Sequence, residues 1–338
     1  MFQFEDAIAD SGWDISLVPF SSDHFLRSRY AGKKAWLRVF LSYGRRILDL
    51  RKSRKADLVW IQIELIPWAP AWFENLLVPR RTPVIYDFDD AVHEQFRESP
   101  RAIIRATLGN KVVRTVGKSD GVVVGNRVLA DFFTTETETP CILFPSAVDT
   151  TERHQADQHL RGEKSSFVFG WIGTPLTFQR YVEGMLGEFD SIAKKLQGEF
   201  WVIGAGAPEL STAHVKYFPW SKETEHQLLQ SIDAGVMPLR DDPWSRGKCG
   251  YKLLQYMAVG KPVLALLVGV NAEIIKHGKN GFLVEELGDW ERYLRTLAED
   301  RGLAAEMGKK AANVVVKSYS LEVNAPTLVR FLRDSADG

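Results

Sequence analysis

The sequence predicts an α/β protein with two doubly wound domains in tandem, each built on a parallel sheet. Three observations support this prediction. The chain has 338 residues, more than one hydrophobic core of about 250–300 residues accommodates. Short apolar runs alternate with segments of helical periodicity, which is typical of parallel strands joined by crossover helices. The polar segment 150–166 has no apolar face and is interpreted as the linker between the domains.

The first half opens with a helix, because Phe4, Ala7 and Ile8 fall on one helical face and Gly12 then ends the pattern. Strands are predicted at the five apolar runs of this half, residues 13–19, 58–63, 83–88, 121–124 and 141–144. The segments between them are long enough for the crossover helices or loops that parallel pairing requires.

The second half carries six further apolar runs, at residues 167–172, 200–203, 215–218, 234–237, 262–267 and 281–284. Helical periodicity follows the first of them and returns at 290–298, 303–317 and 322–332, and Ser221 is the predicted N-cap of the helix before Ala234. We therefore expect domains at 1–155 and 156–320, then a C-terminal helix and tail at 321–338. A ligand cleft is expected where the carboxyl ends of strands face each other.

Composition and cysteine spacing exclude several classes of protein. The chain has 43 basic and 43 acidic residues, a balance that argues against a polyanion-binding protein. Cys141 and Cys249 show no metal-ligand spacing, which argues against a disulfide framework or zinc site and favours a reducing, cytoplasmic setting. No apolar run approaches the roughly 18 residues of a membrane-spanning helix, and the N-terminus lacks the features of a secretory signal.

The neutral total conceals a basic segment, residues 27–57, with eleven basic residues against two acidic ones. Apolar side chains interleave with the cations, so this segment is suited to an anionic lipid surface. The expected membrane contacts are Lys33, Lys34, Trp36, Arg38, Arg45 and Arg46. A solvated face over core helices is an alternative, and so is a nucleic-acid patch, although no reader motif accompanies it.

Residues 243–268 are the most informative segment for function. A loop with Arg246, Lys248 and Gly250 leads into a short helix that ends at Gly260, and a buried strand follows. A helix N-terminus beside several cations binds anions, and a diphosphate is its natural occupant. The alternative is a solvated basic loop before an ordinary helix.

This segment also carries a family resemblance. The run KCGYKLLQYMAVGKPVLA is followed by GVNAEII and GKNGFLV, and WIGTP, VKYFPWS, DAGVMPL and YSLEVNAP complete the pattern in order. The second domain thereby resembles the donor-binding half of the group 1 retaining glycosyltransferases of GT-B fold, of the bacterial cell-surface polysaccharide type. The resemblance implies two Rossmann-like domains facing a central cleft and a C-terminal helix that packs back toward the first domain. It also implies that the first domain lacks its usual first strand.

The resemblance further implies an enzyme, and the basic segment would place it at the cytoplasmic face of the membrane. It would move a sugar with retention from a nucleotide-sugar donor to a lipid-linked or polysaccharide acceptor, without a metal or other cofactor and without nucleic acid as a partner. Gly247 and Gln255 stand where the family has two glutamates that touch the transferred sugar and the ribose. The expected donor-binding residues are Gly173, Thr174, Trp220, Arg246, Lys248, Gly250, Tyr251 and Gln255.

Three residues are expected to be catalytic. Lys252, beside the helix N-terminus, would stabilise the diphosphate as charge develops on it. Asp87, Asp89 and Asp90 cluster at the end of a predicted strand, where like charges raise one another's pKa unless a ligand or cation compensates them. By resemblance, Asp89 lies where many relatives have a histidine that contacts the transferred sugar, so Asp89 and Asp90 complete the catalytic set. A helix N-cap cluster and a DxD metal site are the alternatives.

Two other functions stay open at this point. A non-catalytic nucleotide-sugar-binding or scaffold protein could keep the GT-B fold, which would explain the absent glutamates. A metal-dependent phosphatase or phosphotransferase could use the aspartate cluster. The stretch VIGAGAP lacks the third glycine of a dinucleotide fingerprint and is a weak signal for an NAD site.

Overall fold

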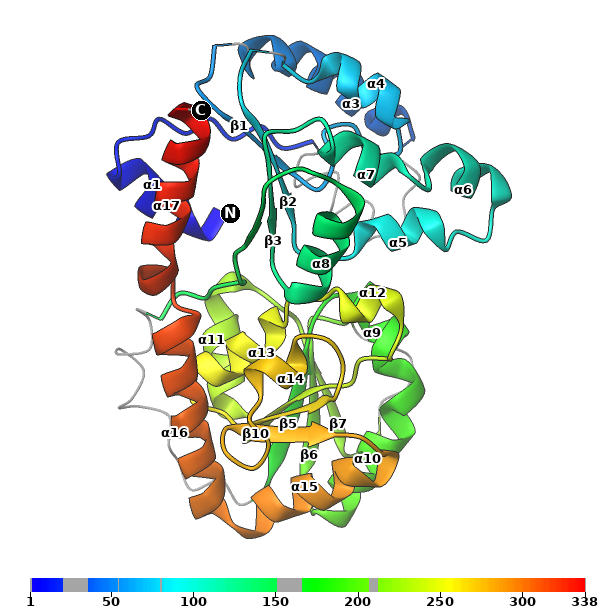
Figure 1. Ribbon diagram of the computed structural model, residues 1–338. Helices are drawn as coiled ribbons and strands as arrows, with labels where there is room; N and C mark the ends of the chain where they lie inside the picture. The colour runs from blue at the N-terminus through cyan, green and yellow to red at the C-terminus, as the bar shows by residue number, and fades with distance from the viewer. Residues whose placement is uncertain are drawn as a thin grey trace. The chain divides into compact units, whose positions relative to one another are not determined.

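The computed structural model describes residues 2–20, 36–53, 55–79, 81–150, 166–206 and 212–337 (Figure 1). The chain forms two compact units: Met1–Pro145 together with Ala325–Gly338, and Ser146–Asn324. Each unit contains a parallel sheet flanked by helices, which confirms the predicted α/β class. The interior of the predicted linker, residues 151–165, lies outside the described residues.

The first unit contains a four-stranded parallel sheet whose spatial order follows the sequence. Its second strand pairs through Ile85 opposite Gly121, and its first pairs through Val59 opposite Val84. All four strands fall within the apolar runs that predicted them: β1 (Val59–Gln62), β2 (Val84–Phe88), β3 (Gly121–Val124) and β4 (Cys141–Leu143). The parallel strands bring their carboxyl ends to one edge of the sheet.

The helices of the first unit connect these strands and cover the sheet. The predicted opening helix is confirmed, since Phe4 and Ile8 are buried and Gly12 adopts a φ of +96° just after it. The bounds are α1 (Glu5–Asp10), α3 (Trp36–Ser53), α4 (Ala71–Leu77), α5 (Val92–Arg97), α6 (Ala102–Leu108), α7 (Lys111–Val116) and α8 (Arg127–Glu136). No helix among the described residues is long and apolar enough to cross a membrane.

The strand predicted at residues 13–19 is wrong. This segment has no helix or strand assignment and pairs with no strand in the described part of the chain. Its apolar alternation gave a strand signal, but a strand also requires an open neighbouring edge within hydrogen-bonding reach. Trp13, Ile15 and Leu17 line a cavity instead.

The second unit contains a six-stranded parallel sheet in the order β10-β9-β8-β5-β6-β7. The chain builds outward from β5 in one direction and then returns to build outward on its other side, so the order reverses between β5 and β8. In doubly wound sheets such a switch point marks the ligand site. The bounds are β5 (Val168–Ile172), β6 (Glu199–Ile203), β7 (Val215–Phe218), β8 (Ala234–Met237), β9 (Val263–Leu266) and β10 (Gly281–Val284), and all six confirm predicted strands.

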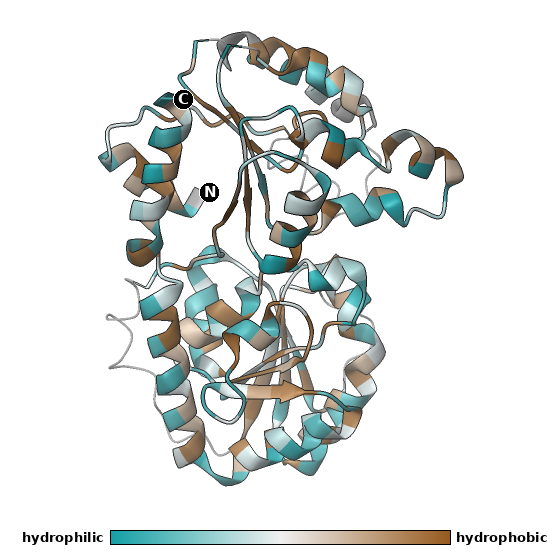
Figure 2. Ribbon diagram, in the orientation of Figure 1, coloured by the Kyte–Doolittle hydropathy of each residue, from teal (hydrophilic) through white to brown (hydrophobic). Residues whose placement is uncertain are grey.

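The core of this unit lies on both faces of the sheet. Phe189 packs against Phe200 with ring centres 4.8 Å apart and against Trp290 at 5.4 Å. Figure 2 shows the strands as largely apolar ribbons. Ser221 accepts a hydrogen bond from Thr224 N–H, which confirms the predicted N-cap. The helices are α9 (Pro175–Tyr181), α10 (Leu186–Lys195), α11 (Lys222–Ser231), α12 (Pro243–Arg246), α13 (Tyr251–Ala258), α14 (Asn271–Ile274), α15 (Leu287–Glu299) and α16 (Arg301–Ser318).

The last helix, α17 (Leu321–Asp337), belongs to the first unit from Ala325 onward. Leu328 and Leu332 are buried, and the guanidinium of Arg333 donates to the carbonyl oxygen of Ser11 at 2.7 Å. The expected return of the C-terminal helix to the first unit is therefore confirmed.

A buried charge cluster ties the loop after β1 to its neighbours. The Lys111 ammonium contacts the carboxylates of Glu64 and Glu74, and its side chain is 1% exposed. Glu74 also accepts from the N–H of Leu65 at 2.9 Å and from the hydroxyl of Tyr86 at 3.0 Å. Burial raises the pKa of Glu64, and the Lys111 charge opposes that shift. One cation therefore compensates two buried carboxylates.

Lys111→Ala is expected to lower the free energy of unfolding by about 3 kcal/mol, because two buried carboxylates lose their cation. Urea denaturation of the full chain, followed by circular dichroism, measures the change. The control is Lys118→Ala, at an exposed position of the same unit, which should stay within about 0.5 kcal/mol of wild type. Equal effects of the two substitutions would show that the cluster does not stabilise the unit.

Candidate functional site

The candidate site lies at the carboxyl edge of the six-stranded sheet, where the loops after β5, β6 and β7 meet. Gly173 N–H donates to the Ile203 carbonyl at 3.0 Å, and Gly204 N–H donates to the Phe218 carbonyl at 2.9 Å. Gly204 has a φ of +86°, and a Cβ there would lie 2.4 Å from the Gly173 carbonyl oxygen and 3.1 Å from the Trp220 Cβ. The loops therefore touch backbone to backbone, an approach that only glycine permits.

Thr174 begins the helix that follows β5. Its hydroxyl accepts from Thr177 N–H, and the Thr177 hydroxyl in turn accepts from Thr174 N–H at 3.0 Å, so the two form a capping box. Thr174 is exposed beside Gly173. The structure thus gives this expected donor-binding residue a helix-capping role.

A carboxylate that the sequence reasoning did not select links two expected donor-binding residues. The indole N–H of Trp220 donates to Glu225 Oε2, and the side-chain amide of Gln255 donates to Glu225 Oε1 at 2.6 Å. Trp220 is 54% exposed. The available signal was the position of Glu225 in the first turn of the helix after a strand, which places it at the carboxyl edge.

The helix α13 brings Lys252 to the same edge. Its N-cap is Gly250, with a φ of +72° and no side chain to cap the first turn. The positive φ favours glycine here, and a Cβ on Gly250 would also lie 2.5 Å from Ile274 Cδ1, so the Ile274 side chain would have to shift. The Lys252 ammonium lies 5.7 Å from the centre of the Trp171 ring, and the same ring would lie 2.5 Å from a Cβ on Gly173. Lys252 thus lies near β5, the strand that ends at Ile172 just before Gly173, and Tyr251 beside it is exposed.

Arg246 is engaged within its own loop. Its guanidinium donates to both carboxylate oxygens of Asp241, at 2.6 and 3.0 Å. Such bidentate pairs have defined geometry and neutralise the cation locally. Arg246 is therefore less available to an anion than the sequence reasoning supposed.

Two other cations share an aromatic surface. The Lys248 ammonium lies 5.9 Å from the Trp244 ring centre and 6.0 Å from that of Tyr181. The Arg180 guanidinium lies 5.6 Å from the Trp244 ring and pairs with Asp242 at 3.2 Å. Cations on aromatic faces are held in position by them. This arrangement favours an anionic ligand after β8.

The expected catalytic aspartates belong to the first unit, at the carboxyl end of β2. Asp87 accepts from the Trp60 indole N–H at 3.2 Å, and burial, with a smaller contribution from the Asp89 charge, raises its pKa to about 6. Asp89 is exposed and Asp90 half-buried. Burial lowers the pKa of the adjacent His93 to about 4, so its ring is neutral near pH 7. In the part of the chain described, no group of three or more potential ligand side chains is arranged to hold a metal ion.

The expected membrane contacts divide into four groups, of which Arg46 is the last. Lys33 and Lys34 lie outside the described residues, and Trp36 and Arg38 belong to the start of α3. Arg45 is exposed and pairs with Asp49 at 3.6 Å.

Arg46 differs from the expectation, because its guanidinium turns inward. It donates to the Val18 carbonyl oxygen at 2.9 Å, and its centre lies 5.7 Å from that of the Phe20 ring. Both contacts tie the extended segment before the basic region to α3.

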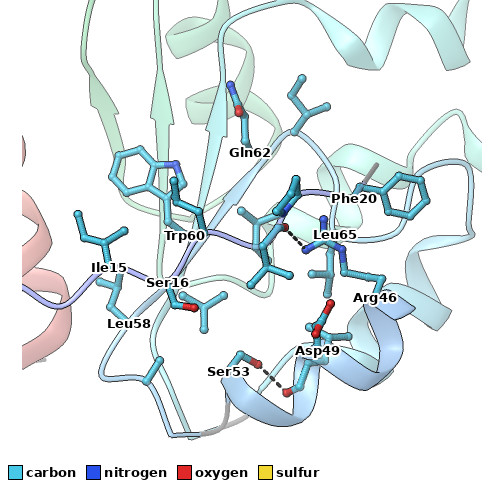
Figure 3. Close-up of a pocket in the computed structure, with 18 of the residues that line it drawn as sticks. Ile15, Ser16, Phe20, Arg46, Asp49, Ser53, Leu58, Trp60, Gln62 and Leu65 are labelled. Carbon is cyan, nitrogen blue, oxygen red and sulfur yellow. Dashed lines mark hydrogen bonds between the residues drawn. The ribbon is translucent and has the colours of Figure 1, made fainter. Parts of the chain in front are cut away.

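Arg46 also lines a cavity of about 730 Å³ in the first unit (Figure 3). The cavity lies beside α3, β1 and residues 13–20, and most of its wall is apolar. Arg46 Nε is buried there without a hydrogen-bond partner in the structure. Burial lowers the pKa of Arg46, and the nearby Asp49 opposes that shift.

Comparison with known proteins matches part of the second unit to a family model and the fold to solved structures. Residues 166–300 match the family model of the glycosyl transferases group 1. No curated protein matches the chain significantly. Among solved structures, TarM superimposes with a TM-score of 0.66 at 15% identity, over 88% of this chain and 58% of TarM. The chain therefore spans less than two thirds of the length of TarM.

Two further structures give similar values over more of their own length. HepE from Anabaena, in complex with UDP-glucose, has a TM-score of 0.64 at 15% identity and covers 86% of this chain and 82% of its own. WaaG, a glycosyltransferase involved in lipopolysaccharide biosynthesis, has a TM-score of 0.67 at 15% identity and covers 98% and 94%. These likenesses confirm the expected GT-B fold.

Gly204→Ala is expected to destabilise the protein more than Gly206→Ala. Both glycines have a φ near +85°, but a methyl group at position 204 meets the Gly173 carbonyl, whereas one at position 206 meets nothing within 4 Å among the described residues. The backbone strain alone costs about 1–2 kcal/mol in each variant, and the clash adds to it only at 204. Thermal unfolding of both variants measures the difference, and equal melting temperatures would show that the loops do not need this close approach.

Proposed function

From a group 1 glycosyl transferase domain at residues 166–300 and a GT-B fold, we propose that this protein transfers a sugar from a nucleotide-sugar donor to a lipid-linked or polysaccharide acceptor. One observation carries the proposal. Lys252, the capless N-terminus of α13, Gly173 and the Trp220–Glu225–Gln255 cluster occupy one edge of one sheet. This arrangement combines a cationic site for a diphosphate with an aromatic and hydrogen-bonding site for a nucleoside.

We assign the nucleotide end of the donor to the second unit. TarM of S. aureus has been crystallised with UDP, and HepE with UDP-glucose, so uridine nucleotides are the first donors to test. Arg180 joins Lys248, Lys252, Gly250 and Tyr251 in this assignment because it shares the Trp244 surface with Lys248.

The proposed chemistry is electrostatic. When the bond between the anomeric carbon and the diphosphate oxygen breaks, negative charge increases on the departing diphosphate. The Lys252 and Lys248 ammonium groups and the first turn of α13 stabilise that charge, which lowers the barrier without requiring a metal ion. We assign Asp89 and Asp90 to the sugar and the acceptor hydroxyl, and we propose retention of the anomeric configuration on the family resemblance.

Lys252→Ala is expected to reduce turnover by roughly 10²–10³, with little change in melting temperature. The control is Lys279→Ala, an exposed lysine of the same unit. Steady-state kinetics with the donor that wild type accepts measures the effect. Full activity with unchanged donor affinity in Lys252→Ala would contradict the assignment.

A second function is favoured by one observation, the glycine and glutamine at positions 247 and 255. A protein without the two carboxylates could bind a nucleotide-sugar without transferring it. Calorimetric titration with UDP-, GDP- and dTDP-sugars, followed by a donor hydrolysis assay, separates the two functions. Binding without turnover supports the scaffold protein, and the absence of binding contradicts both.

We further propose that the first unit binds the cytoplasmic face of an anionic membrane through α3. Leu41 and Leu48, seven residues apart on this helix, are 65% and 58% exposed, and Ile47 and Arg45 accompany them on its exposed surface. Exposed apolar side chains with adjacent cations are typical of interfacial helices.

The double variant Leu41→Asp/Leu48→Asp is expected to weaken binding to phosphatidylglycerol-containing vesicles by roughly tenfold or more. Each aspartate removes apolar area that the membrane would cover, and its charge repels the anionic surface. Vesicle co-sedimentation measures this. Leu287→Asp changes an exposed leucine of the other unit and should bind as wild type does. Equal binding of all three proteins would exclude α3 as the contact.

A further inference from the structure

The contacts of Glu225 fix how Gln255 presents its amide. Glu225 Oε1 accepts from the Gln255 Nε2 group at 2.6 Å, and Glu225 Oε2 accepts from the Trp220 indole. A carboxylate only accepts hydrogen bonds, so the NH₂ group of Gln255 must face it. The carbonyl oxygen of Gln255 is thereby turned away from Glu225. A side chain that could rotate by 180° is held in one orientation.

The cluster consequently offers acceptors to a ligand. The Gln255 carbonyl oxygen and the remaining lone pairs of Glu225 accept hydrogen bonds, while the Gln255 NH₂ and the indole N–H already donate to Glu225. The complementary ligand group is one that donates, and a nucleotide-sugar carries such donors on the hydroxyl groups of its sugar rings and on the N–H groups of its base.

The residues near Gln255 in the site indicate which donor group of the ligand lies beside it. Trp220 presents a 54% exposed aromatic ring on one side of the cluster, and such a ring stacks on a nucleobase. Lys252 precedes Gln255 by three residues on α13, and residues at this spacing are neighbours on a helix surface. In a nucleotide the ribose lies between the base and the phosphates. The ribose hydroxyls therefore fall beside Gln255.

We infer that Glu225 is the positioning residue that gives this site its preference for a ribonucleotide: it holds the Gln255 carbonyl oxygen toward the ribose 2′-hydroxyl and holds Trp220 beside the base. This inference rests on the proposed donor site. Glu225 acts through Gln255 and Trp220, so its removal changes which nucleotide is preferred as well as how tightly it is bound.

The test compares ribo- and 2′-deoxyribonucleoside diphosphates on the full chain. Isothermal titration with UDP, GDP and ADP identifies the nucleotide that wild type binds, and its 2′-deoxy counterpart is then titrated. Wild type is expected to bind the ribonucleotide roughly tenfold or more tightly, the equivalent of one well-placed hydrogen bond. Glu225→Gln, which keeps the shape but allows the Gln255 amide to rotate, should bring the ratio of the two affinities close to one.

Two further variants separate positioning from general damage. Glu223→Ala removes an exposed acidic residue in the first turn of the same helix and should keep the wild-type ratio. The reciprocal exchange Glu225→Gln/Gln255→Glu again pairs an amide with a carboxylate and leaves an oxygen acceptor on α13, so it should restore much of the ratio. Circular dichroism melts establish that each variant is folded.

The outcomes are distinguishable. If folded Glu225→Gln keeps the affinity ratio of wild type, the inference is overturned and the donor site stands. The same conclusion follows if wild type binds the ribonucleotide and its 2′-deoxy counterpart equally. If wild type binds no nucleoside diphosphate, the proposed function fails and the inference fails with it. A lost ratio that the reciprocal exchange does not restore overturns the positioning role of Glu225.

Discussion

The candidate site depends on the backbone contact between Gly173 and Gly204. With only 2.4 Å between a Cβ position at 204 and the Gly173 carbonyl oxygen, no other residue type is accommodated without movement of a loop. This contact fixes the loops after three strands relative to one another. Trp220 lies close to Gly204, since its Cβ would be 3.1 Å from a Cβ there, and the Trp171 ring near Lys252 lies close to Gly173. The rigid sheet supplies the frame, and the two glycines bring the polar side chains within reach of one ligand.

Much of this fold could be predicted from sequence because its signals are local. Ten strands match apolar runs, and Ser221 and Gly12 occupy the helix-end positions that their chemistry favours. The strand predicted at 13–19 failed because pairing depends on a neighbouring edge, which the segment's own residues do not encode. The contact of Arg46 was equally hidden: a basic residue in a basic segment suggests exposure, whereas its guanidinium donates to the carbonyl oxygen of Val18, 28 residues away.

The site itself was only partly predictable. The cations and glycines of residues 243–260 could be recognised from the sequence, because a basic loop before a helix N-terminus predicts an anion-binding site. The hydrogen bond between Gln255 and Glu225 could not be predicted, since 30 residues separate the two and neither residue is unusual for its position in its own helix. A carboxylate from a different helix thus lies against the amide at position 255. The lysines also have aromatic contacts that the sequence alone does not indicate. The ring of Trp171 lies near Lys252 and that of Trp244 near Lys248, whereas the sequence alone assigns these lysines only to a helix and a loop.

The division of α17 between the two units has a consequence for synthesis of the chain. All four strands of the first unit lie before residue 146, yet Leu328 and Leu332 complete its core only after the whole second unit has emerged. Domains usually fold as units in the order of their synthesis. Here the second unit has its complete set of residues first. During synthesis, the residues of the first unit before 146 therefore expose apolar surface until Leu328 and Leu332 of α17 have been made.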